Sequence, residues 1–169
     1  VVLLCFGVAI WLVRQILARD RRRQQAYEER LYALATRDFL TGISNRRAFM
    51  EMAIGELGRA QRENHPISLL LIDIDQFRLV NDIHGYETGD RLLVAFARML
   101  EKMPGEREIG HLSSDRFAAL LPRADAQAAV RRAEQVCAAT TAMAFEWGGQ
   151  SLALSSSVGV VELDANLSV

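Results

Sequence analysis

The hydrophobic pattern of this chain starts with one long apolar run. Residues 1–13 contain no charged side chain, and the run continues beyond Arg14 to residue 18. A helix that spans a bilayer needs about 20 apolar residues, and four arginines follow within residues 19–23, a flank typical of the cytoplasmic end of a span. We therefore expect residues 1–18 to be the end of a transmembrane helix that begins upstream, with the rest of the chain in the cytoplasm. A buried helix of a soluble domain is the alternative.

Residues 19–36 are predicted to form a cytoplasmic linker helix. Tyr27, Leu31 and Leu34 are spaced by four and three positions, as in a helical stripe. The stripe covers little more than one heptad. It fits a dimeric coiled coil and a solvated helix resting on its own domain equally well.

Beyond residue 36 the apolar positions alternate between helical and strand periodicity. Pro104 and Gly105 interrupt the pattern, and Asp125 is placed to cap a helix. The succession of elements predicts an α/β (α+β) domain over residues 37–169, with helices packed on the faces of a sheet that contains antiparallel strands. The predicted helices cover 45–63, 76–83, 90–103 and the segment after Asp125, and the predicted strands cover 67–73, 109–112, 117–121 and a late hairpin of 143–147 with 151–161.

Composition adds two limits to this picture. The chain has 169 residues, half of them apolar, which is enough for one domain of ordinary size plus an appendage. Its formal net charge of −1 gives no reason to expect a DNA partner. The two cysteines, Cys5 and Cys137, lie far apart in apolar surroundings and suggest buried small side chains rather than a disulfide or a metal site.

The candidate chemistry begins where the strand at 67–73 ends. Asp73 closes the apolar run and Asp75 follows two positions later. Carboxylates at the end of a buried strand suit Mg²⁺ and, through it, phosphates, because hard cations prefer oxygen ligands. Plain loop or helix-capping carboxylates would show the same pattern. His84 and His111 are expected to be surface or packing residues, since neither has a second ligand at metal-binding spacing.

Four segments, in order, resemble motifs of the GGDEF (diguanylate cyclase) domain family. Residues 38–47 (DFLTGISNRR) resemble D-x-L-T-G-L-x-N-R-R, and residues 73–78 (DIDQFR) resemble D-I-D-x-F-K. Residues 81–90 (NDIHGYETGD) resemble N-D-x-x-G-H-x-x-G-D, and residues 157–160 (SVGV) resemble S-x-G-V. Several long motifs in the right order are a specific signal. The resemblance implies a ferredoxin-like palm, the sheet of nucleotidyl cyclases, whose C-terminal helix is missing here.

The same resemblance implies a site for GTP and Mg²⁺. In the family, two domains face each other and each 3′-hydroxyl attacks the α-phosphate of the opposite GTP, which gives cyclic di-GMP. Arg78 stands in place of a family lysine near the phosphates and keeps its charge but not its compact ammonium geometry. Carried over, the metal ligands would be Asp73, the backbone carbonyl of Ile74, and Asp115; the nucleotide-binding residues would be Asn81 and Asp90 at the guanine, with Phe77 and Arg78.

The largest departure from the family lies at residues 113–117, where SSDRF replaces the sequence G-G-D/E-E-F; we call this segment the signature turn. Serine disfavours the left-handed backbone that glycine permits, at roughly 1 kcal/mol or more where that backbone is required. Asp115 keeps the first acidic position, but Arg116 replaces the second. A guanidinium reverses the charge beside Mg²⁺ and cannot act as a base at neutral pH. Tyr86 also replaces a family histidine, and the product-inhibition motif R-x-x-D is absent from residues 104–107.

These observations favour a degenerate GGDEF domain without cyclase activity, anchored at the inner (cytoplasmic) membrane. It would act as a regulatory, GTP-sensing or dimerisation module in cyclic di-GMP signalling. The resemblance also implies a homodimer and leaves room for a downstream EAL-type phosphodiesterase domain. Two alternatives stay open: an active diguanylate cyclase that tolerates the altered turn, and a scaffold that binds protein or RNA and no nucleotide.

Overall fold

The computed structural model describes residues 15, 19, 32, 34–105 and 108–163. The chain divides into two units, Val1–Thr36 and Arg37–Val169. The predicted transmembrane and linker helices fall almost wholly outside the described residues. Among the residues that are described, no helix has the length and apolar character needed to cross a bilayer.

The second unit alternates helices and strands in the predicted order, with one short strand before the first helix that was not predicted. A loop at residues 38–43, which we call the lead-in loop, precedes the first strand. The described elements are β1 (Ser44–Asn45), α2 (Arg46–Glu63), β2 (Ile67–Ile74), α3 (Phe77–His84), α4 (Tyr86–Lys102), β3 (Glu108–Ser113), β4 (Arg116–Pro122), α5 (Ala126–Thr141), β5 (Phe145–Trp147), β6 (Gln150–Leu152) and β7 (Ser156–Leu163).

The strands form a mixed five-stranded sheet with the order β1-β3-β4-β2-β7 and a separate two-stranded sheet of β5 and β6. β1 runs parallel to β3, whereas β2 pairs antiparallel with both β4 and β7. β2 therefore has a hydrogen-bonded neighbour on each side, as its continuous apolar sequence predicts. The end of β2 at Asp73 lies opposite Arg116 on β4 and Ser157 on β7.

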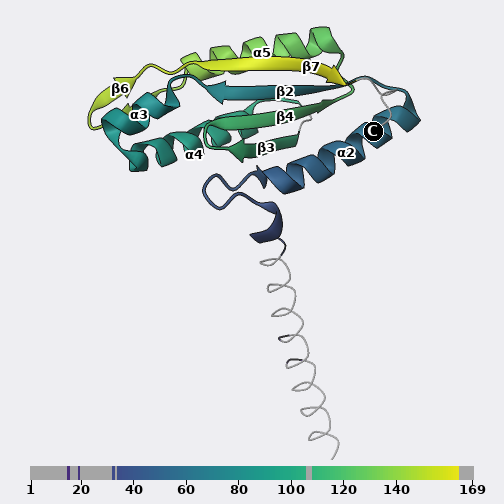
Figure 1. Cartoon of the computed structure of the whole chain (residues 1–169), viewed down its shortest axis with the longest axis horizontal. Helices are drawn as coiled ribbons and strands as arrows, with labels where there is room; N and C mark the ends of the chain where they lie inside the picture. Colours follow the sequence, from purple (N-terminus) through teal and green to yellow (C-terminus); the bar gives the residue numbers. More distant parts are fainter. Residues whose placement is uncertain (1–14, 16–18, 20–31, 33, 106–107, 164–169) are drawn as a thin grey trace, which may run out of the picture. The chain divides into compact units, whose positions relative to one another are not determined.

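Helices cover both faces of the sheet, which confirms the predicted layers (Figure 1). Alternate residues of β2 and β4 face α3, α4 and α5 on one side, where Phe96 and Phe117 are fully buried with ring centroids 5.1 Å apart. The opposite side packs against α2 through Phe49 and Leu120. This alternation follows from the two-residue period of side chains along a strand.

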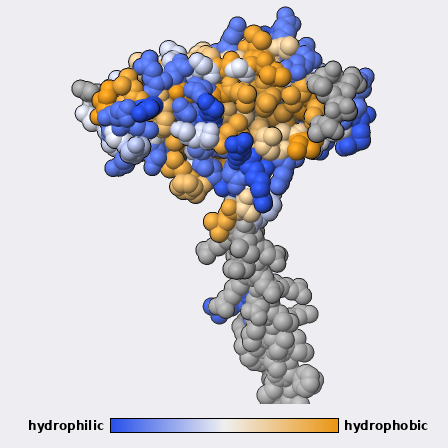
Figure 2. Space-filling model, viewed as in Figure 1, coloured by the Kyte–Doolittle hydropathy of each residue, from blue (hydrophilic) through white to orange (hydrophobic). Residues whose placement is uncertain are grey.

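The sheet face on the α2 side is only partly covered in the described part of the chain. Leu71 of β2 and Val161 of β7 lie on that side and are 45% and 47% exposed. Met50 and Ile54 of α2 are exposed as well. Figure 2 shows the resulting apolar area on the face turned to the viewer.

Two predicted boundaries are wrong. The helix expected at 90–103 begins at Tyr86 and includes Gly89. A Cβ at Gly89 would overlap the side chain of Asn81, so the packing there requires glycine although glycine is unfavourable inside a helix. The strand expected at 151–161 is split into β6 and β7. The residues between them turn Leu154 into the core and bring Ser155 to Asp75, contacts that a single straight strand could not make.

Candidate functional site

The signature turn lies beside the end of β2. β3 and β4 form the predicted hairpin, and their last pair is Ser113 with Arg116. The backbone N–H of Ile74 donates to the carbonyl oxygen of Asp115 at 3.3 Å. The structure therefore brings together the three predicted metal ligands, Asp73, Ile74 and Asp115, with Arg116 among them.

Arg116 pairs with the carboxylate that the family resemblance assigns to the metal. Its Nε lies 3.3 Å from Oδ2 of Asp73, directly across the β2–β4 register. The two side chains are 69% and 44% exposed, so the pair is screened by water and contributes at most about 1 kcal/mol to stability. The chemical consequence of the pair is larger, because it holds a permanent positive charge beside Asp73, the first candidate metal ligand.

A cavity of about 410 Å³ opens beside this pair. Arginines contribute from α2 and from the turn, and apolar side chains form much of the remainder. The lining residues are Arg46, Met50, Leu71, Ile72, Asp73, Leu112, Ser113, Arg116 and Phe117.

The backbone of the turn requires a left-handed residue at one of the two serines. Ser114 has φ of +40°, whereas Ser113 is not among the residues with positive φ. The strain predicted from the loss of two glycines is therefore confirmed at the second position only.

Asp75 is a structural carboxylate in this arrangement. The hydroxyls of Ser155 and Ser157 donate to its two oxygens at 2.6 and 2.7 Å. These two hydrogen bonds hold the pKa of the Asp75 carboxyl below its ordinary value of 3.8 and outweigh the opposing effect of burial. Asp75 thereby ties the end of β2 to the start of β7, which is the plain loop role that its sequence position also allowed.

The predicted guanine-binding residues come together where α3 meets α4. Asn81 of α3 lies against Gly89, the neighbour of Asp90 on α4. The Oδ1 atom of Asn81 is buried and has no hydrogen-bond partner in the described residues, whereas Asp90 is exposed. A buried amide oxygen without a hydrogen-bond partner costs free energy. Which end atom of an Asn side chain is oxygen and which is nitrogen is assigned from their hydrogen-bond partners. The pair can supply the donor and acceptor groups that match a guanine edge.

The two other predicted nucleotide-binding residues differ in their surroundings: the Phe77 ring packs on Gly89 next to Asn81, whereas Arg78 lies on the surface. Phe77 is 6% exposed and belongs to the core. Arg78 is almost fully exposed and lies 3.7 Å from Asp82, one turn along α3. The nucleotide-binding role of both residues stays a prediction, as does the place of Arg78 near the phosphates.

Sequence reasoning missed the position of His111. Its ring is nearly buried and contacts Asp38 of the lead-in loop and the backbone of Ser114 in the signature turn. The D-x-x-T spacing of the lead-in loop was a usable signal, because an Asp often binds the residue three positions on. Nothing in the sequence placed His111 beside it.

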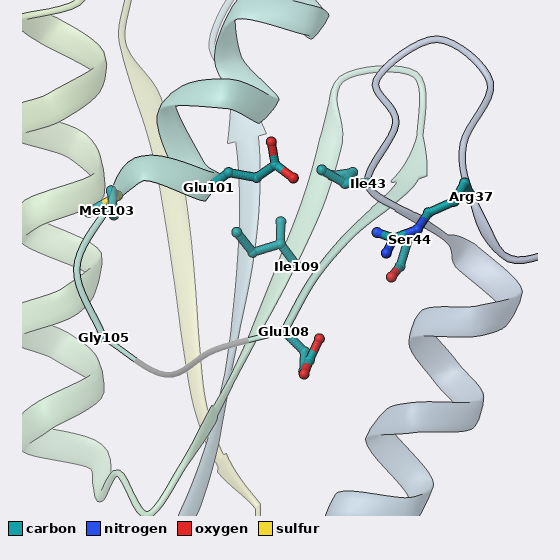
Figure 3. A pocket seen from close by; sticks show the side chains of 8 residues that line it. All are labelled: Arg37, Ile43, Ser44, Glu101, Met103, Gly105, Glu108 and Ile109. Carbon is teal, nitrogen blue, oxygen red and sulfur yellow. The ribbon is translucent and has the colours of Figure 1, made fainter. Parts of the chain in front are cut away.

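A second cavity, of about 290 Å³, lies between residues 37–44, the end of α4 with the adjoining Met103, and the start of β3. In Figure 3, Arg37 and Ser44 come from the first of these, Glu101 and Met103 from the second, and Glu108 from the third. Gly105 also lines it, within the stretch where the R-x-x-D motif is absent. Two carboxylates and one arginine are the charged residues among the described part of its lining.

The donor set at the end of β2 does not fit a Mg²⁺ ion as it stands. Mg²⁺ needs oxygen ligands in near-octahedral geometry, and here one carboxylate oxygen of Asp73 is already paired with Arg116. Within the described residues, no three acidic, histidine or cysteine side chains gather as a metal site would require. The assignment of Mg²⁺ to Asp73, Ile74 and Asp115 stays a prediction that depends on Arg116 moving away.

Comparison with known families gives one match that covers most of the chain. The profile described as "Diguanylate cyclase, GGDEF domain" matches residues 35–168. The "Probable diguanylate cyclase DgcC" of Escherichia coli K12 is 33% identical over 166 residues, which are 98% of this chain and 43% of that protein. This chain therefore spans less than half the length of that relative.

Solved structures agree with this match. Diguanylate cyclase SiaD of Pseudomonas aeruginosa, solved in complex with its activator SiaC, is 30% identical with a TM-score of 0.74, covering 96% of this chain and 64% of that chain. The coiled coil and GGDEF domain of DgcB from Caulobacter crescentus, in complex with c-di-GMP, has a TM-score of 0.81 at 24% identity, covering 89% of this chain and 81% of that chain. The second likeness shows the fold alone.

Proposed function

Because this chain belongs to the GGDEF family of diguanylate cyclase domains, we propose that it serves cyclic di-GMP signalling as a degenerate domain that senses GTP or dimerises and makes no cyclic di-GMP. The observation that carries this proposal is the pair between Arg116 and Asp73. It removes a metal ligand and supplies a cation where metal-assisted phosphoryl transfer needs a dication and a base.

The nucleotide side of the site supports a sensing role. Asn81 and Asp90 are retained, and the close contact of Asn81 with Gly89 holds the amide beside Asp90. Recognition of guanine needs hydrogen bonds and no metal. A domain of this kind can bind GTP weakly through its base while its phosphates lack a full metal site.

The proposal includes a setting for the domain. Residues 1–18 would anchor the chain in the cytoplasmic membrane, and residues 19–36 would link the anchor to the domain as a helix in a homodimer. Asp73 and Asp115 would meet Mg²⁺ only together with GTP. A phosphodiesterase domain downstream would be the output that the bound nucleotide regulates.

Fluorescent GTP titrated into the 169-residue chain tests the sensing role. We expect saturable binding of GTP that ATP does not displace and that EDTA changes little. Asn81→Ala and Asp90→Ala should each weaken this binding at least about tenfold, a loss of roughly 1.4 kcal/mol of binding free energy. Glu134→Ala, at an exposed carboxylate on α5, is the matched control and should bind normally. No saturable binding by a folded chain would overturn GTP sensing and favour the scaffold.

A further inference from the structure

His111 joins two segments that are far apart in the sequence. Its side chain is only 9% exposed, and its Nδ1 lies 3.1 Å from Oδ1 of Asp38 in the lead-in loop. Its Nε2 lies 2.9 Å from the backbone carbonyl oxygen of Ser114 in the signature turn. One imidazole ring therefore bridges the loop that leads into the domain and the turn that carries Arg116.

Both partners of the ring accept hydrogen bonds and have no proton to donate. A backbone carbonyl and an ionised carboxylate offer only lone pairs. A neutral imidazole has one N–H and one bare nitrogen, so it can satisfy one of the two oxygens and must face the other with a lone pair. The doubly protonated ring donates to both, and the geometry at His111 matches this form.

Asp38 is held in its ionised form by its neighbours. Burial raises the pKa of its carboxyl, but hydrogen bonds from Thr41 Oγ1, from the Thr41 N–H and from His111 lower it by more, and the net pKa lies below its ordinary value. The two Thr41 bonds measure 2.7 and 2.9 Å. The carboxylate on one side of the ring is therefore a fixed acceptor at neutral pH.

Two uncharged residues, Phe117 and Asn45, also lie next to His111. β4 turns Phe117 against it, with ring centroids 4.7 Å apart and an interplanar angle of 21°. β1 places Asn45 opposite His111 in the register. Asp38 is the carboxylate that the ring faces, and Arg116 on the same hairpin is paired with Asp73.

The lead-in loop is a firm support for this contact. The N–H of Asp38 donates to the carbonyl of Ile43 at 2.8 Å, and the N–H of Gly42 donates to the carbonyl of Asp38 at 2.9 Å. Ile43 is 2% exposed and belongs to the core. Ser114 sits at the strained position of the turn, so the bond to its carbonyl oxygen opposes relaxation of that strain.

We propose that His111 is the positioning residue of the signature turn, that it holds the turn to the lead-in loop in its doubly protonated form, and that the turn shifts when the ring loses a proton. The turn carries Asp115 and Arg116, so its position sets the geometry of the Arg116–Asp73 pair. The device is a property of the folded chain without nucleotide, so it stands or falls separately from the proposed function.

NMR of the ¹⁵N-labelled chain without nucleotide tests this. Ring nitrogens and the amides of Ser114 and Asp115 would be followed from about pH 5 to about pH 8, the range of histidine switches. We expect two protonated nitrogens on His111 at the acid end. We also expect the chemical shifts of both amides to change with pH along the same titration curve as the ring nitrogens. A singly protonated ring at the acid end would overturn the proposal.

Two substitutions separate positioning from mere packing. In His111→Gln, which carries no titrating group, the two amides should stop following pH. In His111→Arg, which offers permanent donors, they should stay at their low-pH positions throughout. His65→Gln is the control, because His65 lies near Glu63 and Pro66 before β2 begins, and the wild-type curve should persist. An unchanged curve in His111→Gln would contradict the proposal.

Discussion

At the scale of single residues, Arg116 decides what the end of β2 can bind. Its guanidinium occupies the side of Asp73 that a cation would need. In Arg116→Glu, we expect Mn²⁺ to raise the melting temperature, because an occupied site stabilises the fold by about 2.7 kcal/mol at a hundredfold excess over Kd. The wild type should show no such rise in differential scanning fluorimetry.

Arg123→Glu is the matched control for that experiment. Arg123 has the same exposure, 69%, and pairs with Glu63 at 3.0 Å from another strand end. Both substitutions should lower metal-free stability by less than about 1 kcal/mol, as exposed ion pairs do. An equal Mn²⁺ effect in all three proteins would mean that Arg116 does not block the site.

Two helical glycines give opposite predictions at this scale. A Cβ at Gly89 would overlap the side chain of Asn81, whereas one at Gly55 meets nothing within 4 Å. Gly89→Ala should therefore lower the free energy of unfolding by about 1–3 kcal/mol through overpacking. Gly55→Ala should raise it by roughly 0.5–1 kcal/mol. Urea denaturation followed by circular dichroism measures both, and equal effects would contradict the α3–α4 packing described above.

At the scale of elements, Asp75 ties β2 to β7 through two serine hydroxyls. Its pKa is lower in the folded state than in the unfolded chain. The carboxylate therefore stabilises the fold fully above the unfolded pKa, and this stabilisation is lost as the pH falls from about 4 through the folded pKa. In Asp75→Asn, the free energy of unfolding should therefore fall less steeply as the pH is lowered, which denaturation at a series of acidic pH values measures.

Asp82→Asn serves as the control for this measurement, because Asp82 lies exposed on α3. It should keep the wild-type dependence on pH. If stability falls at low pH in Asp75→Asn as it does in the wild type, the Asp75 hydrogen bonds between β2 and β7 do not contribute to the dependence of stability on pH.

Local patterns predicted the elements well and their long-range partners poorly. The apolar run of β2, the cap at Asp125 and the hairpin around the signature turn all follow from nearby residues. The break between β6 and β7 does not, since it depends on Asp75, about 80 positions away. His111 shows the same limit at the site, because its role comes from Asp38 and from the fold that brings them together.

At the scale of the whole molecule, the question is whether decay of the site is confined to the signature turn. The triple variant Ser113→Gly, Ser114→Gly and Arg116→Glu restores the family residues there. If the remaining site is intact, it should gain Mn²⁺-dependent synthesis of cyclic di-GMP. Ser113→Gly with Ser114→Gly alone, which relieves the strain but keeps Arg116, should gain none. Activity in the double variant would mean that the strained backbone of the turn, and not the charge of Arg116, prevents synthesis.

The absence of cyclase activity is tested most directly by an assay for cyclic di-GMP synthesis by the wild-type chain. The chain would be incubated with GTP and Mg²⁺, and then with Mn²⁺, and the nucleotides separated by chromatography. We expect unreacted GTP and no cyclic di-GMP above a sample without protein, because Arg116 pairs with Asp73. Cyclic di-GMP above that background would contradict this expectation and would make Asp73 and Asp115 a sufficient metal site.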